Sequence, residues 1–332
     1  MSDIELLLQA AVTARAALFD EPHRAAFRLF NGFLEGCPDL VIDLYGRTAL
    51  IHNYAKPAAA GEPLVTAAHG FLQEHFAWLE AVVVKTRHSG QAEEKNGRLL
   101  MGTKPDHWIS EFEVRYAVDM LMNRDASFYL DTRNLRRWLL DRCAGQTVLN
   151  TFAYTGSLGV AAQAAGAKQV IQTDLNKKFL NVAKTSYTLN GFPIDKKNFV
   201  TGDFWSVTKR FNREKMLFDT VILDPPFFSK TAKGRVDLAQ NVVRLVNKLR
   251  PLVRHNGRIV VINNALFVSG SAYIEALQAL CHDGYVSLEE SIPIGEDFVG
   301  YPETRRGELV TDVVPFNHTT KIAVLRISHK GR

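Results

Sequence analysis

Three acidic residues in the second half of the sequence follow short apolar runs that are typical of buried strands. They are Asp174, Asp203 and Asp224. Sheets built from alternating strands and helices bind their ligands beyond the carboxyl ends of the strands, and a carboxylate there accepts hydrogen bonds from hydroxyl and amino groups. The pattern therefore predicts that strand ends hold a ligand with such groups.

A glycine turn precedes the first of these acids. Residues 147–152 are β-capable, the polar turn 154–157 contains Gly156, and an alanine-rich helical stretch follows. Strand, glycine turn and helix is the layout by which a parallel sheet presents backbone N–H groups and a helix N-terminus to a ligand. Asp174 lies about 20 residues further on, where such sheets hold a ribose diol. A nucleoside-containing ligand is the prediction.

Two features distinguish between nucleotides. The turn contains Gly156 and Gly159 in the pattern G-x-x-G and lacks the second glycine of G-x-G-x-x-G, which admits a pyrophosphate. A buried strand further on ends in Asp224-Pro-Pro-Phe227. A ribose acid without a pyrophosphate loop, together with Asp-Pro-Pro-aromatic, favours S-adenosylmethionine over NAD. We therefore interpret the chain as a methyltransferase.

Hydrophobic periodicity divides the chain into a small mixed α/β domain at 1–118, expected to bind substrate, and a methyltransferase domain at 119–332. In the first, helices are predicted at 4–19 and 63–79, strands at 27–32, within 40–54 and at 81–85, and an exposed loop at 87–97. In the second, strands and helices alternate at 147–152, 157–165, 168–173, 177–190, 198–201, 219–223, 236–254, 258–263, 271–282, 285–290 and 320–327. Such alternation indicates parallel strands with helices on both faces.

Composition sets broad limits. The 332 residues are 46% apolar and 23% charged, as in ordinary globular proteins, and no run is long enough to span a bilayer. The three cysteines have no paired spacing, so we expect a cytoplasmic protein without disulfides and without a metal site. The net charge of +5 permits a polyanionic partner but does not require one.

The motifs together resemble a known family. Tyr129–Asn134, Asn150–Gly156, Asp174, Asp203 and Asp224–Phe227 are similar to motifs of the class I methyltransferases that modify 23S ribosomal RNA, a group that includes a cytosine-C5 enzyme and a related guanine-N7 enzyme. The resemblance implies a Rossmann-like sheet of seven strands with the last antiparallel. It also implies S-adenosylmethionine as cofactor and RNA as partner, with a base presented over Asp-Pro-Pro. A homodimer is left open.

The motifs supply two sets of candidate residues. Asp224, Pro225, Pro226 and Phe227 are the candidate catalytic residues, as acceptor and stacking groups for a base. The candidate cofactor-binding residues are Asp131, Arg133, Asn150, Phe152, Tyr154, Thr155, Gly156, Asp174, Asp203 and Phe204.

Five of these have specific predicted roles. Asp174 would accept from the ribose, and Asp203 from the adenine amino group, with Phe204 packing on the adenine ring. Asp131 and Arg133 would reach the amino and carboxylate ends of the cofactor. Purely structural roles remain as alternatives: a helix cap for Asp174, a turn for Asp203 and a solvated helix start for Asp131 and Arg133. Gly156 could likewise serve a tight turn without a ligand.

The target atom is less well defined. A cytosine-C5 enzyme needs a nucleophilic cysteine, but Cys37, Cys143 and Cys281 all lie outside the motifs, and the strand at 258–263 ends in Asn263-Asn264, which looks like the guanine-N7 relative. We expect methylation of a base nitrogen of RNA. The alternatives are a cytosine-C5 enzyme, a small-molecule methyltransferase or a non-catalytic RNA-binding protein. The loop 301–306 is a candidate substrate lid or a plain connector.

Overall fold

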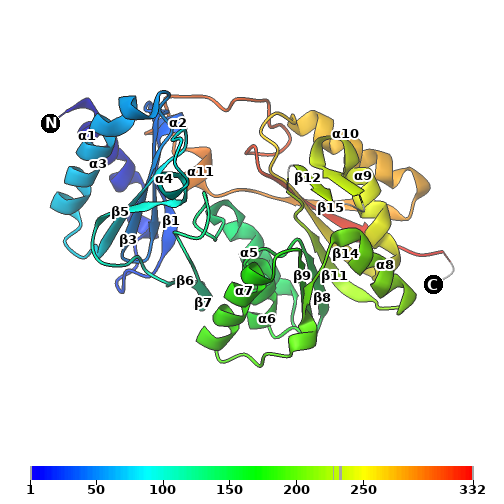
Figure 1. Cartoon of the computed structure of the whole chain (residues 1–332). Coiled ribbons are helices and arrows are strands. Elements are labelled where there is room, and N and C mark those ends of the chain that lie inside the picture. The colour runs from blue at the N-terminus through cyan, green and yellow to red at the C-terminus, as the bar shows by residue number, and fades with distance from the viewer. Residues whose placement is uncertain (1, 227, 232–233, 331–332) are drawn as a thin grey trace. The chain divides into compact units, whose positions relative to one another are not determined.

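A computed structural model describes residues 2–226, 228–231 and 234–330. The chain forms two compact units (Figure 1). Unit 1 comprises Met1–Leu130 and Gly295–Glu308, and unit 2 comprises Asp131–Ile294 and Leu309–Arg332. The sequence placed a single boundary near residue 118. The structure instead divides the chain after Leu130 and assigns a late segment to unit 1, a long-range association that local sequence patterns do not reveal.

Unit 1 is built on a five-stranded sheet in the order β1-β2-β3-β4-β5, in which only β3 and β4 pair in parallel. Its elements are α1 (Asp3–Ala14), β1 (Ala26–Asn31), α2 (Gly32–Glu35), β2 (Leu40–Tyr45), β3 (Thr48–Asn53), α3 (Glu62–His75), β4 (Ala81–Thr86), α4 (Ala92–Asn96), β5 (Arg98–Met101), β6 (Trp108–Glu111), β7 (Val114–Ala117) and α11 (Glu296–Val299). Helices α1 and α3 bury apolar stripes that include Leu8 and Leu72 in one core with the sheet. The predicted loop at 87–97 is wrong in part, since α4 lies within it.

The late segment of unit 1 is fixed by buried polar contacts. Arg15 and Glu35 form an ion pair of 2.9 Å with almost no exposure. The Thr304 hydroxyl donates to Glu35, and Arg15 donates to the carbonyl of Asp297. Breaking a buried pair by removing one partner is costly because an uncompensated charge remains. Thr304 therefore anchors the loop 301–306 to unit 1, while most residues of the loop are exposed. This result favours neither a lid nor a plain connector.

Unit 2 contains a seven-stranded sheet in the order β10-β9-β8-β11-β14-β16-β15. Strands β10, β9, β8, β11 and β14 pair in parallel, whereas β16 is antiparallel to both of its neighbours. The elements are α5 (Arg133–Arg142), β8 (Thr147–Thr151), α6 (Ser157–Ala164), β9 (Gln169–Asp174), α7 (Lys177–Leu189), β10 (Phe199–Thr201), α8 (Phe204–Arg213), β11 (Phe218–Leu223), β12 (Phe228–Thr231), β13 (Gly234–Asp237), α9 (Leu238–Leu249), β14 (Val253–Asn263), α10 (Gly270–Leu280), β15 (Val286–Ile292) and β16 (Lys321–Ile327). The predicted Rossmann-like sheet of seven strands with an antiparallel last strand is confirmed. Helix α8 and the β12–β13 hairpin were not predicted.

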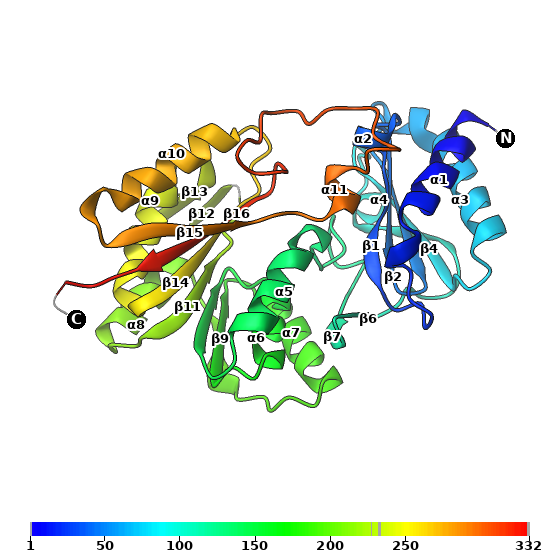
Figure 2. The same ribbon diagram turned by 180° about the vertical axis from the view of Figure 1, so that it is seen from behind.

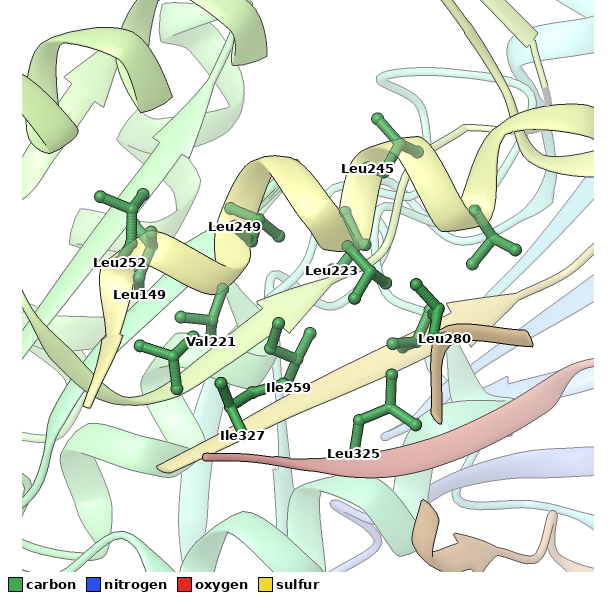
Figure 3. Packing of buried hydrophobic residues seen from close by; sticks show 14 of the residues in the cluster. Leu149, Val221, Leu223, Leu245, Leu249, Leu252, Ile259, Leu280, Leu325 and Ile327 are labelled. Atoms are coloured by element: carbon green, nitrogen blue, oxygen red, sulfur yellow. The ribbon is translucent and has the colours of Figure 1, made fainter. Parts of the chain in front are cut away.

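Helices cover both faces of this sheet, α8, α9 and α10 on one side and α5, α6 and α7 on the other (Figure 2). Alternate residues along the central strands, such as Val221, Leu223 and Ile259, point into the first layer, where they meet Leu245 and Leu249 of α9 (Figure 3). This two-residue period is what a buried strand face requires. The core holds the strand ends, and thus the site, in fixed register. None of the helices in the described part of the chain has the length and hydrophobicity needed to cross a bilayer.

Candidate functional site

The strand order of unit 2 determines where a ligand can bind. From β8 the chain builds outward through β9 to β10, and it then returns to place β11 on the other side of β8. The strand order therefore reverses between β8 and β11, and open α/β sheets bind ligands at this point, beyond the carboxyl ends of the strands. We call this side of the sheet the carboxyl edge. The strands β8, β9, β10, β11 and β14 all end there.

The turn between β8 and α6 has an unusual backbone. Phe152 and Tyr154 have φ values of 53° and 51°, and Gly156 has a φ of 80°. A Cβ atom on Gly156 would lie 2.4 Å from Oε1 of Gln172 and 2.5 Å from the Cβ of Ala183. Glycine is therefore required for packing and for backbone conformation alike. Positive φ values at two bulky residues mark a strained turn of the kind that clusters at ligand sites.

Asp174 is firmly held at the end of β9. Its carboxylate accepts the backbone N–H of Tyr154 at 2.9 Å and that of Asn176 at 2.8 Å. Burial raises the pKa of the carboxyl above its usual value, although these hydrogen bonds oppose the shift. The alternative role as the cap of α7 is wrong, because Asn176 caps that helix by accepting from the N–H of Lys178. Asp174 ties the glycine turn to β9 instead.

Asp203 has a local structural role. Its Oδ1 accepts the N–H of Ser206 at 3.0 Å and so caps α8. The next residue, Phe204, is largely buried and stacks on Phe152 with ring centroids 5.0 Å apart. This aromatic pair joins the turn after β8 to the start of α8. Asp203 and Phe204 thus follow β10 at the same edge as Asp174.

The remaining predicted residues of the glycine turn do not all reach this edge. Asn150 is buried within β8, where its Nδ2 lies 3.4 Å from Oε1 of Gln172 on the neighbouring strand. Thr155 is buried in the turn, whereas Tyr154 is partly exposed and packs edge-on against Phe179. The structure therefore separates Asn150, a side chain of the sheet interior, from the groups that lie at the carboxyl edge.

Asp131 and Arg133 lie at the start of unit 2. Asp131 accepts a hydrogen bond of 2.7 Å from the Thr320 hydroxyl, which fixes it beside the beginning of β16. Arg133 is the first residue of α5 and is partly exposed. Asp131 is close enough to Asp224 for its charge to raise the pKa of that carboxyl. Two carboxylates from distant parts of the sequence are therefore neighbours.

Asp224 follows directly after β11. Burial, together with the charge of Asp131, raises its pKa to about 7, and no hydrogen bond from the described part of the chain counteracts this shift. Tyr273 of α10 lies nearby. Burial raises the pKa of its phenol, and the charge of Asp224 adds to this shift. Pro225 is buried and Pro226 exposed, whereas Phe227 lies outside the described residues. A partly buried acid with this pKa marks a candidate functional position.

Two residues that were not among the predicted site residues also lie at this edge. Asn263 ends β14 with no exposure, and its Nδ2 has no hydrogen-bond partner in the described structure. Leu175 follows Asp174 and is 61% exposed. In the sequence, Asn263 could have been found as a polar residue at the end of a central strand. Leu175 could have been found as an apolar residue directly after Asp174, the predicted ribose-binding acid.

The arrangement fits S-adenosylmethionine. The two carboxylates of Asp131 and Asp224 suit a ligand that carries positive charge on its sulfonium and amino groups. Asp174 lies at the neighbouring strand end, and the exposed side chain of Leu175 offers an apolar surface beside it. Among the residues that the structure describes, no group of three or more acidic, histidine or cysteine side chains could hold a metal ion.

Comparison with known proteins agrees with this geometry. Residues 80–279 match the model of the S-adenosylmethionine-dependent methyltransferase family. The chain belongs to this family: it is a methyltransferase enzyme, and its cofactor is S-adenosylmethionine.

Individual relatives are more distant. The chain is 29% identical over 299 residues to the "Putative ribosomal RNA large subunit methyltransferase YwbD" of Bacillus subtilis, covering 88% of this chain and 74% of that one. It is 27% identical over 249 residues to ribosomal RNA large subunit methyltransferase I of Photobacterium profundum, covering 72% of this chain and 62% of that one. The chain thus spans less than two thirds of the second relative.

A solved structure shares the fold. The crystal structure of SMU.776, described as "a putative methyltransferase complexed with SAH", superposes with a TM-score of 0.84 at 20% identity and covers 98% of this chain and 81% of that one.

Proposed function

We propose that this enzyme methylates a base of ribosomal RNA from the large subunit. The names of its relatives support this substrate class. Within the chain, the supporting observation is an acceptor and a donor at the ends of adjacent strands, the Asp224 carboxylate and the Asn263 Nδ2. Neither of these two groups has a hydrogen-bond partner among the described residues. The edge of a nucleobase carries the complementary donors and acceptors.

The cofactor residues act by holding and orienting the ligand. Asp174 accepts hydrogen bonds from the ribose hydroxyls, and the turn at Gly156 brings backbone close to the amino-acid part of the cofactor. Asp203 accepts from the adenine amino group. Asp131 attracts the amino group and Arg133 pairs with the carboxylate. The sulfonium supplies a methyl group that is already activated, so the chain mainly has to position the acceptor and exclude water.

We further propose that the acceptor atom is a base nitrogen. In unit 2, Cys143 directly follows α5 and precedes the start of β8, while Cys281 follows α10 and precedes β15, which places both at the side of the sheet opposite the carboxyl edge. Burial raises the pKa of the Cys143 thiol to about 12, so it is not a thiolate nucleophile. Cys37 belongs to unit 1. A ring nitrogen with a lone pair needs no cysteine and no obligatory base.

Unit 1 is proposed to bind the RNA. Phe33 is 45% exposed and meets Tyr54 edge-on at 4.9 Å, and the guanidinium of Arg87 lies 5.8 Å from the Tyr54 ring centre. The backbone N–H of Arg306 donates to Leu34, which brings a second exposed arginine beside Phe33. Neither arginine forms an ion pair with a described residue. An exposed ring and a partly exposed ring beside cations without an ion pair suit stacked bases and phosphates.

The proposal is tested by following a tritiated methyl group from S-adenosylmethionine into large-subunit RNA and, separately, into a small-metabolite extract. Label in the RNA supports the proposal, and label only in metabolites would show that the substrate is a small molecule. A Phe33→Ala/Arg306→Ala double variant should weaken RNA binding but leave calorimetric cofactor affinity unchanged. Leu6→Ala/Arg98→Ala, which alters exposed residues on α1 and β5, serves as the matched control.

A further inference from the structure

A short turn at the carboxyl edge exposes two large apolar side chains. Leu266 is 52% exposed and Phe267 is 83% exposed, and both follow the end of β14. We call these two residues the apolar wedge. A turn tip normally carries polar residues, and exposing a phenylalanine this far gives up its hydrophobic stabilisation. Such exposure therefore indicates a surface used for contact with another molecule.

The turn that carries the wedge is firmly anchored. Oδ1 of Asn263 accepts the N–H of Ala265 at 2.9 Å, and the buried ammonium of Lys321 donates to the Ala265 carbonyl at 3.2 Å. The N–H of Val268 donates to the same carbonyl, and Ser269 then caps α10. The base of the turn is thus held on both sides while its tip projects. A side chain presented on a fixed backbone loses little entropy on binding.

The position of the wedge relates it to the proposed base site. Asp224 follows β11, and the wedge follows the adjacent parallel strand β14, so both lie at the same edge of the sheet. Tyr273 lies close to β14, because its hydroxyl donates to the Val261 carbonyl. Asp224 contributes to the raised pKa of the same phenol, so Tyr273 also lies near Asp224. The wedge is therefore one strand away from the acid that would bind the target base.

We propose that the apolar wedge inserts into the substrate RNA and stacks on the bases that neighbour the target base. This inference rests on the proposed function. A base can reach Asp224 only after it leaves its stack, and apolar side chains that take its place or separate base steps favour that extrusion. Val310 and Val314, 71% and 64% exposed, extend the apolar contact, because their segment is joined to α10 by a hydrogen bond from Gly270 to Asp312.

The proposal is tested with Phe267→Ala, Phe267→Trp and the control Ile194→Ala, which alters an apolar residue of 40% exposure between α7 and β10. Methyl transfer is measured on folded large-subunit RNA and on the same RNA after fragmentation and heat denaturation. Stacking on one base contributes roughly 1–3 kcal/mol, so Phe267→Ala should lower kcat/KM on folded RNA about 5- to 150-fold. On unstructured RNA the loss should be about twofold or less, because no stack has to be opened.

Several outcomes separate this inference from the function it rests on. Phe267→Trp should restore most of the activity, and cofactor affinity should be the same in all variants. Equal losses on folded and unstructured RNA, or no loss at all, would overturn the wedge while leaving RNA methylation intact. If light scattering showed a dimer for the wild type and a monomer for Phe267→Ala, the apolar wedge would belong to a subunit interface instead. Absence of any RNA methylation by the unaltered enzyme would overturn the proposed function and the wedge together.

Discussion

The two halves of the site differ in how their polar groups are partnered. At the ends of β9 and β10, Asp174 and Asp203 accept hydrogen bonds from backbone N–H groups, and the glycine turn is packed against Gln172. At the ends of β11 and β14, the Asp224 carboxylate and the Asn263 amide nitrogen have no hydrogen bond from a described residue. We refer to these as the cofactor half and the substrate half.

The difference indicates that one half of the site contributes to stability and the other to turnover. Groups in the cofactor half hold the protein together and are proposed to hold its ligand, so changes there should impair folding and cofactor binding together. The Asp224 carboxylate and the Asn263 amide nitrogen are removed from water in part or in full without a hydrogen bond from a described residue, which costs stability. Changes there should reduce turnover and leave the fold intact or more stable.

The largest effect on stability is expected for Gly156→Ala. The new methyl group would lie 2.4 Å from Gln172 in a backbone with φ of 80°, so strain and overpacking together should lower the free energy of unfolding by about 2–5 kcal/mol. Urea denaturation measures this. Gly166→Ala is the matched control, since its φ is 81° and no atom lies within 4 Å of its Cβ position. Equal losses in the two variants would show that the packing against Gln172 contributes nothing.

Asp224→Asn should have opposite effects on turnover and stability. Loss of a charged acceptor should reduce methyl transfer about 10- to 100-fold. Burial and Asp131 raise the pKa of this acid to about 7 in the folded protein, so the wild type loses stability progressively as pH rises toward and through 7. The variant, which cannot ionise, should therefore have a higher Tm at pH 8, and the gain should shrink toward pH 5.

The control for this experiment is Asp195→Asn, an exposed acid between α7 and β10. It should show neither the loss of turnover nor the gain of stability at high pH. A variant Asp224→Asn that is less stable than the wild type at pH 8 would mean that the substrate half contributes to the fold after all.

Asp174→Ala tests the cofactor half by binding. The substitution leaves two backbone N–H groups without their acceptor, which should lower the free energy of unfolding by about 1–3 kcal/mol. It should also weaken S-adenosylmethionine binding, since the ribose hydroxyls lose their partner. Calorimetric titration and urea unfolding measure the two effects. Unchanged cofactor affinity in the folded variant would remove Asp174 from the cofactor site.

Replacement of the cysteines should have the smallest effect. Cys37→Ser, Cys281→Ser and Cys143→Ala together should leave turnover within about twofold, because neither thiol of unit 2 lies at the carboxyl edge. The assay is single-turnover methyl transfer at saturating RNA. A folded triple variant without activity would bring back the cytosine-C5 mechanism.

Sequence patterns were sufficient for the sheet of unit 2 because its strands and helices alternate with clear periods and its motifs stand at strand ends. The helix-cap alternative for Asp174 failed since Asn176, two residues later, caps α7. The membership of Gly295–Glu308 in unit 1 could not be predicted, because it depends on contacts such as Arg15 with Glu35 and Asp297 that join distant parts of the chain. Nor could the lack of hydrogen-bond partners at the Asp224 carboxylate and the Asn263 Nδ2 be predicted, since burial of a polar atom depends on the packing around it.

The central claim is that Asp224 presents an RNA base to the methyl group. The most direct measurement is nucleoside mass spectrometry of large-subunit ribosomal RNA after reaction with S-adenosylmethionine and either the wild type or Asp224→Asn. We predict one new nucleoside methylated on a base nitrogen with the wild type and a strongly reduced yield with the variant. A methyl group on carbon 5 of cytosine, on ribose or on no nucleoside at all would contradict it.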